Sequence, residues 1–187
     1  MEIKYPEIGI CGLSCQLCPK YQATATNPCL GCKSAQGRAI ACPFVACAIK
    51  KHEVEFCWDC PEALTCKIWK EHREFSLLHD TFHCCQTLAN DIIFEKKNGL
   101  QQFLFAQTLR AKLLEKMLKD FDEGKSTAYY CTVATVFLPY EIRAALEQAE
   151  AVLSASTTLT VNERAALLHS ILDEKAKEKG YALTLRV

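Results

Sequence analysis

Cysteine is the residue type in this sequence with the most chemical potential, and its distribution along the chain is uneven. The chain has 187 residues and 13 cysteines. Ten of them fall within residues 11–66: Cys11, Cys15, Cys18, Cys29, Cys32, Cys42, Cys47, Cys57, Cys60 and Cys66. Thiols clustered this densely are typical of metal ligands or of a disulfide framework. We therefore expect a functional site in the first third of the chain.

The spacing of the clustered cysteines favours metal binding. Three pairs have two residues between them and a looser pair has four: Cys15/Cys18, Cys29/Cys32, Cys57/Cys60 and Cys42/Cys47. Two intervening residues let the backbone fold back so that both sulfurs reach one ion, and a tetrahedral zinc site takes four sulfurs at about 2.3 Å. Four pairs predict two zinc ions, with Cys11 and Cys66 left over.

The spacing leaves open which cysteines share an ion. The simplest grouping is sequential, in two sets of four: Cys15, Cys18, Cys29 and Cys32, then Cys42, Cys47, Cys57 and Cys60. An interleaved grouping fits the spacing as well. Because Cys11 could replace a member of the first set and Cys66 a member of the second, all ten cysteines are candidate metal ligands.

Other uses of the thiols are also open. Iron–sulfur clusters are held by four thiolates, so an iron–sulfur redox or electron-transfer protein is the main alternative. Thiol redox enzymes use Cys-x2-Cys pairs that open a helix in a strand–helix unit, and none of the three pairs does so clearly. The triplet Cys11, Cys15 and Cys18 has the spacing of radical S-adenosylmethionine enzymes, but the strand–helix alternation of their barrel is missing. No catalytic constellation is recognisable.

Composition and charge narrow the class of protein. Lys+Arg and Asp+Glu number 22 each, without the basic excess of a nucleic-acid binder. No run of about 18 apolar residues could span a membrane, and the N-terminus has no apolar signal core. We therefore expect a cytoplasmic protein that binds neither nucleic acid nor membranes, with an unknown protein or small molecule as partner. A reducing cytoplasm also disfavours disulfides.

The elements that must position the cysteines differ between two parts of the chain. Residues 1–66 have few large apolar side chains, so a module of this size needs a staple such as a metal ion. Residues 67–187 have helical periodicity, with helices expected at 67–80, 81–97 and 100–122, from Pro139 onward, and after a capping box at Thr160 and Glu163. We predict a mainly α protein with a small irregular cysteine-rich metal-binding module, residues 1–66, and a helical domain, residues 67–187.

Some segments and side chains outside the cluster are less clear. Residues 127–138 suit either a strand or a buried helix, and the alternation in residues 181–187 predicts a short C-terminal strand. Cys85 and Cys131 are expected in the hydrophobic core. His79 and His83 could share a helix face and a metal, but half-buried structural histidines are favoured. Trp58 and Trp69 are expected to shield the metal module where it meets the helices.

The order of the cysteine motifs resembles a known family. The motifs follow one another in family order: residues 11–15 with Cys18-Pro19 and Tyr21, then 29–32, 42–48, 56–60 and Cys66. They resemble the cysteine-rich prokaryotic family catalogued as domain of unknown function 3795, over residues 8–70. Ser14, Ala46 and Thr65 stand where that family usually has Asp, Arg and Pro. The resemblance implies a zinc-binding protein without an established activity, and it supports Cys11 and Cys66 as ligands.

These observations predict a zinc-binding protein in which the metal is mainly structural and the cysteine-rich module serves interaction or binding. The coordination of an ion by four protein thiolates leaves no open position for water, so hydrolytic chemistry is not expected. The iron–sulfur protein remains the alternative.

Overall fold

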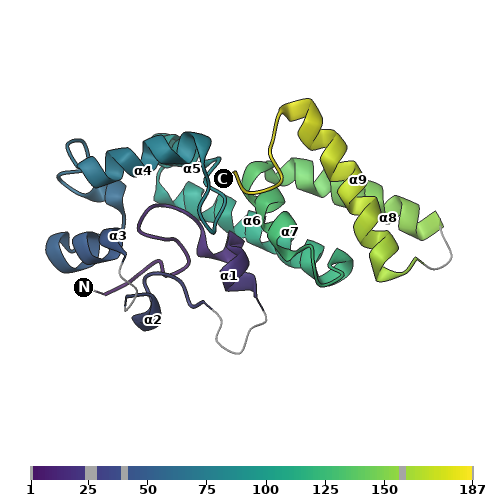
Figure 1. The fold of residues 1–187 in the computed structure, drawn as a ribbon, viewed down its shortest axis with the longest axis horizontal. Helices are drawn as coiled ribbons and strands as arrows, with labels where there is room; N and C mark the ends of the chain where they lie inside the picture. The colour runs from purple at the N-terminus through teal and green to yellow at the C-terminus, as the bar shows by residue number, and fades with distance from the viewer. Residues whose placement is uncertain (1, 24–28, 39–41, 156–158, 187) are drawn as a thin grey trace.

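The protein is mainly helical. The computed structural model describes residues 2–23, 29–38, 42–155 and 159–186. The C-terminal two thirds consist of α4 (Lys67–Leu78), α5 (Leu88–Asn98), α6 (Leu100–Phe121), α7 (Thr127–Val136), α8 (Pro139–Ala155) and α9 (Val161–Lys179) (Figure 1). The described residues include no strand, and a bridge between Ile8 and Ser14 is isolated. None of the helices in these ranges has both the length and the apolar character needed to cross a membrane.

Short helical turns and irregular chain make up the first 66 residues. The turns are η1 (Cys15–Leu17), α1 (Pro19–Gln22), α2 (Ala35–Arg38), α3 (Pro43–Val45), the π-helical η2 (Ala46–His52) and η3 (Cys57–Asp59). Pro19 and Pro43 begin α1 and α3, because proline is pre-shaped for the first turn and lacks an N–H that the turn would leave unpaired. The cysteines therefore lie on short turns and loops that no long helix holds in place.

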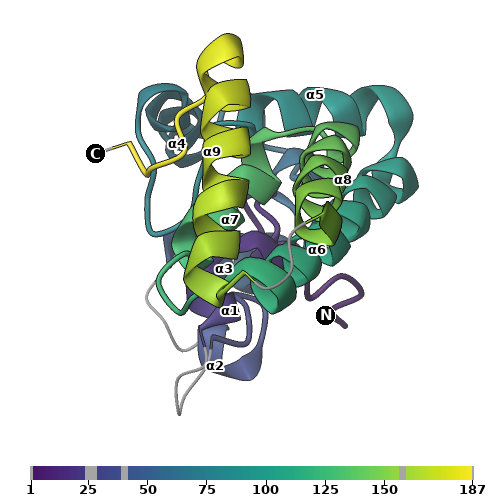
Figure 2. The same ribbon diagram turned by 90° about the vertical axis from the view of Figure 1, so that its right-hand side faces the viewer.

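Helix α6 is the centre of the helical body. It packs against α5, α7, α8 and α9 (Figures 1 and 2). The helix predicted over residues 100–122 is confirmed, and Phe103, Leu113 and Met117 on it are all buried. The main core gathers around this helix and draws on α7, α8 and α9 as well. The helical body therefore has an ordinary hydrophobic core.

The ambiguous segment 127–138 forms a helix. All residues of α7 from Tyr130 to Val136 are buried, because α1, α6 and α8 surround it. A helix enclosed in this way is apolar on all sides and shows no amphipathic period. Its β-branched residues are therefore explained by burial.

The helix predicted over 81–97 begins later, at Leu88. The Asp80 carboxylate accepts the N–H of Cys85 at 2.6 Å, and both ring nitrogens of His83 lie at hydrogen-bond distance from carbonyl oxygens, of Cys84 at 2.9 Å and of Ser14 at 2.7 Å. These bonds hold residues 80–87 in an irregular conformation. His79 and His83 thus do not share a helix face, and His83 is a buried structural residue.

The predicted C-terminal strand is wrong for residues 181–186, and Val187 lies outside the described residues. Every second residue of this segment does face the core, since Tyr181, Leu183 and Leu185 pack on it. The backbone of Arg186, however, exchanges hydrogen bonds with Asp80: its N–H donates to the carboxylate and its carbonyl accepts from the Asp80 N–H, each at 2.8 Å. An extended segment lying on helices produces the same alternation as a strand.

The N-terminal segment and the helical body share buried contacts. Leu17 belongs to the main core, and Ile8 and Phe56 cluster with Phe103 of α6. The ring of Trp58 also meets Phe103 edge-on, with 5.8 Å between centroids. The change in composition near residue 66 therefore does not interrupt the packing.

Candidate metal centre

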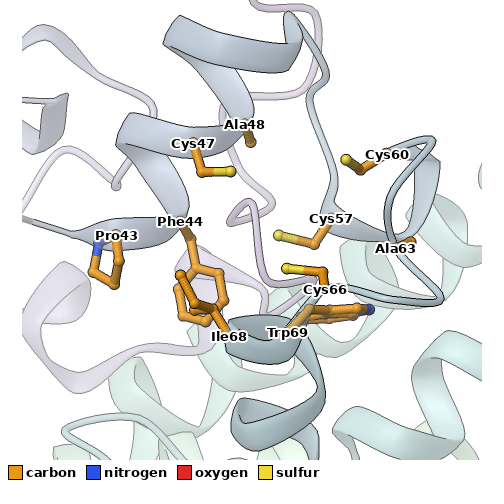
Figure 3. A pocket seen from close by; sticks show the side chains of 10 residues that line it. All are labelled: Pro43, Phe44, Cys47, Ala48, Cys57, Cys60, Ala63, Cys66, Ile68 and Trp69. Atoms are coloured by element: carbon orange, nitrogen blue, oxygen red, sulfur yellow. The ribbon is translucent and has the colours of Figure 1, made fainter.

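Four cysteines face one small cavity in the N-terminal segment. They are Cys47, Cys57, Cys60 and Cys66, and Figure 3 shows their sulfurs pointing into the space between their segments. The cavity has a volume of about 20 Å³. This volume is room for about one water-sized particle. The fold therefore brings together four thiols that are up to 19 positions apart in the sequence.

Each of these four side chains is positioned by a local turn. Cys47 lies on η2, and Cys57 and Cys60 flank η3, where the N–H of Cys60 donates to the carbonyl of Cys57 at 3.3 Å. The N–H of Cys57 donates to the carbonyl of Ile10 at 2.9 Å, which ties the knuckle to the turn at residues 10–11. Cys66 is the N-cap residue of α4. Its position is thus coupled to the first helix of the body.

Apolar side chains form the rest of the wall. Trp69 is buried and meets Phe44 edge-on, with 6.3 Å between ring centroids. Ala48, Ala63 and Ile68 complete the lining. Trp69 packs with Cys11, Cys57 and Cys66, and Trp58 belongs to the same cluster. Both tryptophans therefore lie between the thiols and the helices, as expected.

The electrostatics of this group disfavour isolated thiolates. Burial raises the pKa of the Cys57 thiol, and the nearby Cys11, Cys66 and Cys47 raise it further. Four neutral thiols would be stable in such a place, whereas several negative charges would repel one another. A divalent cation reverses this balance because it compensates the charge of the thiolates that bind it.

A second group of thiols surrounds Gly9. A β-carbon added at Gly9 would lie 3.6 Å from Sγ of Cys11 and 3.6 Å from Sγ of Cys32. Cys15 shares a hydrogen bond with Cys32, which raises the pKa of Cys15 and lowers the pKa of Cys32. Burial raises the pKa of Cys11 to about 12, with further contributions from Cys32 and Cys42. Cys11, Cys15, Cys32 and Cys42 are therefore electrostatic neighbours.

The remaining two clustered cysteines form a separate pair. Burial raises the pKa of the Cys18 thiol, and Cys29 is among the charges that add to this shift. Neither residue lines the cavity of the first group. Cys84, Cys85 and Cys131 are buried, as expected for Cys85 and Cys131.

A buried lysine beside the second group was missed from the sequence. Lys33 is only 1 % exposed, and its ammonium group donates to Glu55 at 3.0 Å and to the carbonyl of Tyr5 at 3.1 Å. It also lies 3.9 Å from the ring centre of Phe56. Its charge helps to lower the pKa of Cys32. The one sequence signal was its position next to a predicted ligand.

Glycines allow the segments around the thiols to approach closely. Gly12 has φ +92°, and a β-carbon there would overlap the indole of Trp58. A β-carbon at Gly37, on α2, would lie 2.6 Å from Cα of Cys32. These positions have no space for a side chain, so the backbone itself forms part of the packing around both groups.

In the part of the chain that the structure describes, no three Cys, His, Asp or Glu side chains are already arranged as a metal site. The chemistry of the donors nonetheless fits an ion that prefers sulfur, because four thiols and apolar side chains line the cavity of the first group. Hard cations such as Mg²⁺ and Ca²⁺ require oxygen ligands, which the lining does not provide.

The fold and these groups define a mainly helical protein with a cysteine-rich, thiol-lined N-terminal segment. Residues 7–71 match the model of the family described as "Protein of unknown function (DUF3795)". The resemblance expected from the cysteine motifs is therefore confirmed, and the cysteine-rich segment belongs to this family. The comparisons with curated proteins and with solved structures found no match.

Proposed function

We propose that the N-terminal segment binds two zinc ions, each held by four thiolates, and that these ions mainly stabilise the segment. The observation that carries the proposal is the group Cys47, Cys57, Cys60 and Cys66, whose sulfurs face one cavity of about 20 Å³. Three separate backbone segments supply them.

The second ion is assigned to Cys11, Cys15, Cys32 and Cys42. Support comes from the shared hydrogen bond of Cys15 and Cys32 and from the two sulfurs beside Gly9. The proposed grouping follows chain order but differs from the simplest one: it divides the pairs Cys15/Cys18, Cys29/Cys32 and Cys42/Cys47, and it takes in both Cys11 and Cys66. The positive charge of Lys33 nearby would offset part of the negative charge of an ion bound by four thiolates.

The size of the first cavity favours a single ion over a cluster. Iron–sulfur clusters also use four thiolates, but a cluster contains several iron and sulfide atoms. A space for one water-sized particle suits one tetrahedral ion better. Zinc is the divalent ion that is commonly held by four thiolates in a tetrahedral, redox-inactive site.

A structural role follows from the ligand set. Four protein thiolates leave no open position for water or substrate, and Phe44 and Trp69 close the site with apolar surface. The local hydrophobic clusters in this segment are also small: one contains only Ile10, Val45 and Ala48 as buried residues. Metal binding can supply the missing folding free energy. The stabilised segment would then serve as an interaction module in a reducing compartment such as the cytoplasm.

Elemental analysis of anaerobically purified protein tests the proposal. We expect two zinc ions per chain and a colourless preparation. A brown protein that contains iron and bleaches on reduction would support the iron–sulfur alternative and overturn the proposal, as would full-length protein without any metal.

Double variants test the grouping of ligands. Cys47→Ser with Cys57→Ser should remove one zinc ion because both belong to the same group, whereas Cys47→Ser with Cys11→Ser should remove both ions. Cys29→Ser should retain two ions in the proposed grouping but lose one if Cys15, Cys18, Cys29 and Cys32 share an ion. Cys131→Ser is the control, since this thiol lies in the core of the helical body.

A further inference from the structure

The helical body contains a second cavity, far larger than the thiol-lined one. Its volume is about 600 Å³, within the range of about 300–1,000 Å³ that is typical of small-molecule sites. Helices α5 and α6, the α7–α8 junction and the C-terminal segment all contribute to its wall. No cysteine lines it, so any function of this cavity is independent of the metal proposal.

Arg110 of α6 provides the strongest polar feature of this cavity. The residue is 7 % exposed, and its Nη1 donates to the carbonyls of Ala134, at 3.2 Å, and Thr135. Both carbonyls belong to the last turn of α7, where a cation is favoured. These bonds hold the guanidinium in one place. The N–H groups on Nε and Nη2 have no hydrogen-bond partner among the described residues, so a rigid fork with spare donors lines the cavity.

A second buried polar group lacks a partner. Gln107, three residues before Arg110 on the same helix, is 4 % exposed and lines the cavity. Its amide has no hydrogen bond within the described part of the chain. Buried amides are nearly always paired with protein, water or ligand. The amide is therefore available to a polar group inside the cavity.

The cavity also contains a carboxylate near this arginine. Asp91 of α5 accepts a hydrogen bond from the hydroxyl of Thr87 through Oδ2 at 2.9 Å, which leaves Oδ1 without a partner among the described residues. Burial raises the pKa of Asp91, and the charge of Arg110 opposes that shift. Arg186 also lines the cavity, but its guanidinium is already engaged by Asp80, Ser76 and Leu77. The charges left to meet a ligand are one cation and one anion.

Apolar and aromatic side chains form much of the remaining wall, beside the polar Gln86, Thr87 and Asn90. Phe94 and Phe103 come from α5 and α6, and Tyr181 of the C-terminal segment is held edge-on against Phe137 with 5.2 Å between centroids. Val136 and Leu138 lie at the α7–α8 junction. Surfaces of this kind bury an apolar or aromatic substituent well.

We propose that this cavity binds a small zwitterion, with a carboxylate and an ammonium group beside an apolar or aromatic substituent, which is the chemistry of a free apolar amino acid. The fork of Arg110 would take the carboxylate in a bidentate manner. Asp91 would take the ammonium group, and Gln107 would bond either. A simple carboxylic acid would leave Asp91 without a counter-charge, and a simple amine would do the same to Arg110.

Binding measurements on the full-length protein as purified test this proposal. The probes are phenylalanine, phenylacetate, which lacks the ammonium group, and phenethylamine, which lacks the carboxylate. We expect phenylalanine to raise the melting temperature and to bind at least about tenfold more tightly than either analogue, the value of one charge-assisted hydrogen bond. Equal binding of the three probes, or no binding of phenylalanine, would overturn the proposal.

Two variants locate the binding. Arg110→Lys keeps a positive charge but loses the fork, and should weaken phenylalanine binding by at least about tenfold. Because Arg110 also holds the end of α7, Ala106→Leu provides a second test: it fills part of the cavity and keeps the guanidinium of Arg110. Thr108→Leu is the control, because residue 108 is exposed on the same helix. Phenylalanine binding that survives Ala106→Leu at full affinity would contradict this site. Zinc content should be unchanged in all three variants.

Discussion

The helical body and the N-terminal segment fill their interiors with different chemistry. The core of the body is a continuous set of aliphatic and aromatic side chains around α6. Three small clusters of three buried residues each lie within the N-terminal segment or where it meets the helices, and thiols lie beside two of them. Apolar burial contributes about 25 cal/mol per Å², so a large core stabilises itself whereas a small one does not. The comparison teaches that a cysteine-rich composition can mark the part of a fold whose hydrophobic clusters are small.

Removal of the proposed zinc ions is the strongest test of this difference between the two parts of the molecule. A strong chelator under reducing conditions should unfold the N-terminal segment and leave most of the helical signal, because structural zinc contributes about 10–16 kcal/mol of binding free energy in small modules. Trp58 and Trp69 both lie beside the thiols, so tryptophan fluorescence reports on the segment. Circular dichroism at 222 nm reports mainly on the body.

The outcome that would contradict this prediction is a single transition in which both signals are lost together, or fluorescence that does not change after zinc is removed. Addition of zinc to the chelated protein should restore the original fluorescence, which distinguishes a loss of metal from oxidation of the thiols.

A pair of glycine substitutions sharpens the comparison at one residue in each part. Gly12 and Gly124 have nearly equal backbone angles, φ +92° and φ +90°. A β-carbon at Gly124 meets nothing within 4 Å, whereas one at Gly12 overlaps Trp58. We expect Gly124→Ala to lower the free energy of unfolding by about 1 kcal/mol, from the strain of the left-handed backbone alone. Gly12→Ala should lower the free energy of unfolding by about 3 kcal/mol, because the overlap with Trp58 adds to the backbone strain.

Denaturant unfolding of both variants measures these costs. Equal destabilisation would show that the ring of Trp58 moves away freely, and it would remove the argument that the backbone at Gly12 is packed tightly against the indole. Gly12→Ala should also reduce zinc retention in the presence of a competing chelator, while Gly124→Ala should not.

A smaller effect is expected from the ion pair that attaches the C-terminal segment to the body. Asp80 accepts from Nε and Nη2 of Arg186, each at 3.0 Å. Burial alone would raise the pKa of Asp80, but the hydrogen bonds from Arg186 and from the N–H of Cys85 lower it below its usual range. A lowered pKa contributes stability above the unfolded value of about 3.9, and this contribution is lost as the pH falls through the folded pKa.

Asp80→Asn should therefore lower the free energy of unfolding by about 2 kcal/mol at pH 7, and the difference from the unmodified protein should shrink below about pH 4. Thermal unfolding between pH 7 and pH 3 checks this, with the exposed Glu147→Gln as control. A difference that stays constant down to pH 3 would exclude the charge of Asp80 as its source.

Much of the helical body could be predicted from local signals. The capping box of Thr160 and Glu163 and the stop at Gly180 are both present, because these motifs act through the nearest turn. The strand predicted over residues 181–186 and the helix start predicted at residue 81 were wrong for the opposite reason. Both depend on Asp80, whose partners include a residue 106 positions away, and periodicity carries no information about such a bond.

The candidate site divides in the same way. Clustering and spacing predicted ten cysteines as candidate ligands, and the proposed sites use eight of them. A knuckle such as Cys57/Cys60 could be predicted because it is a local turn. The grouping proposed from the structure could not be chosen from the sequence, because it depends on how η2 and the N-cap of α4 face each other. The larger cavity could not be predicted from the sequence either. In the sequence, Gln107 and Arg110 have the pattern of ordinary polar positions on an amphipathic helix, and only the packing of α5 and the C-terminal segment places them in a cavity.

Leu17 has a consequence for dissection of the protein. It lies between Cys15 and Cys18, yet its side chain is buried in the main core with residues of α6 and α7. A fragment that starts at Lys67 would expose the apolar residues of α6 and α7 that Leu17 covers, and a fragment that ends at Cys66 would expose Leu17 itself. Fragments for biochemical work are therefore better chosen by shared buried contacts than by the change in cysteine density.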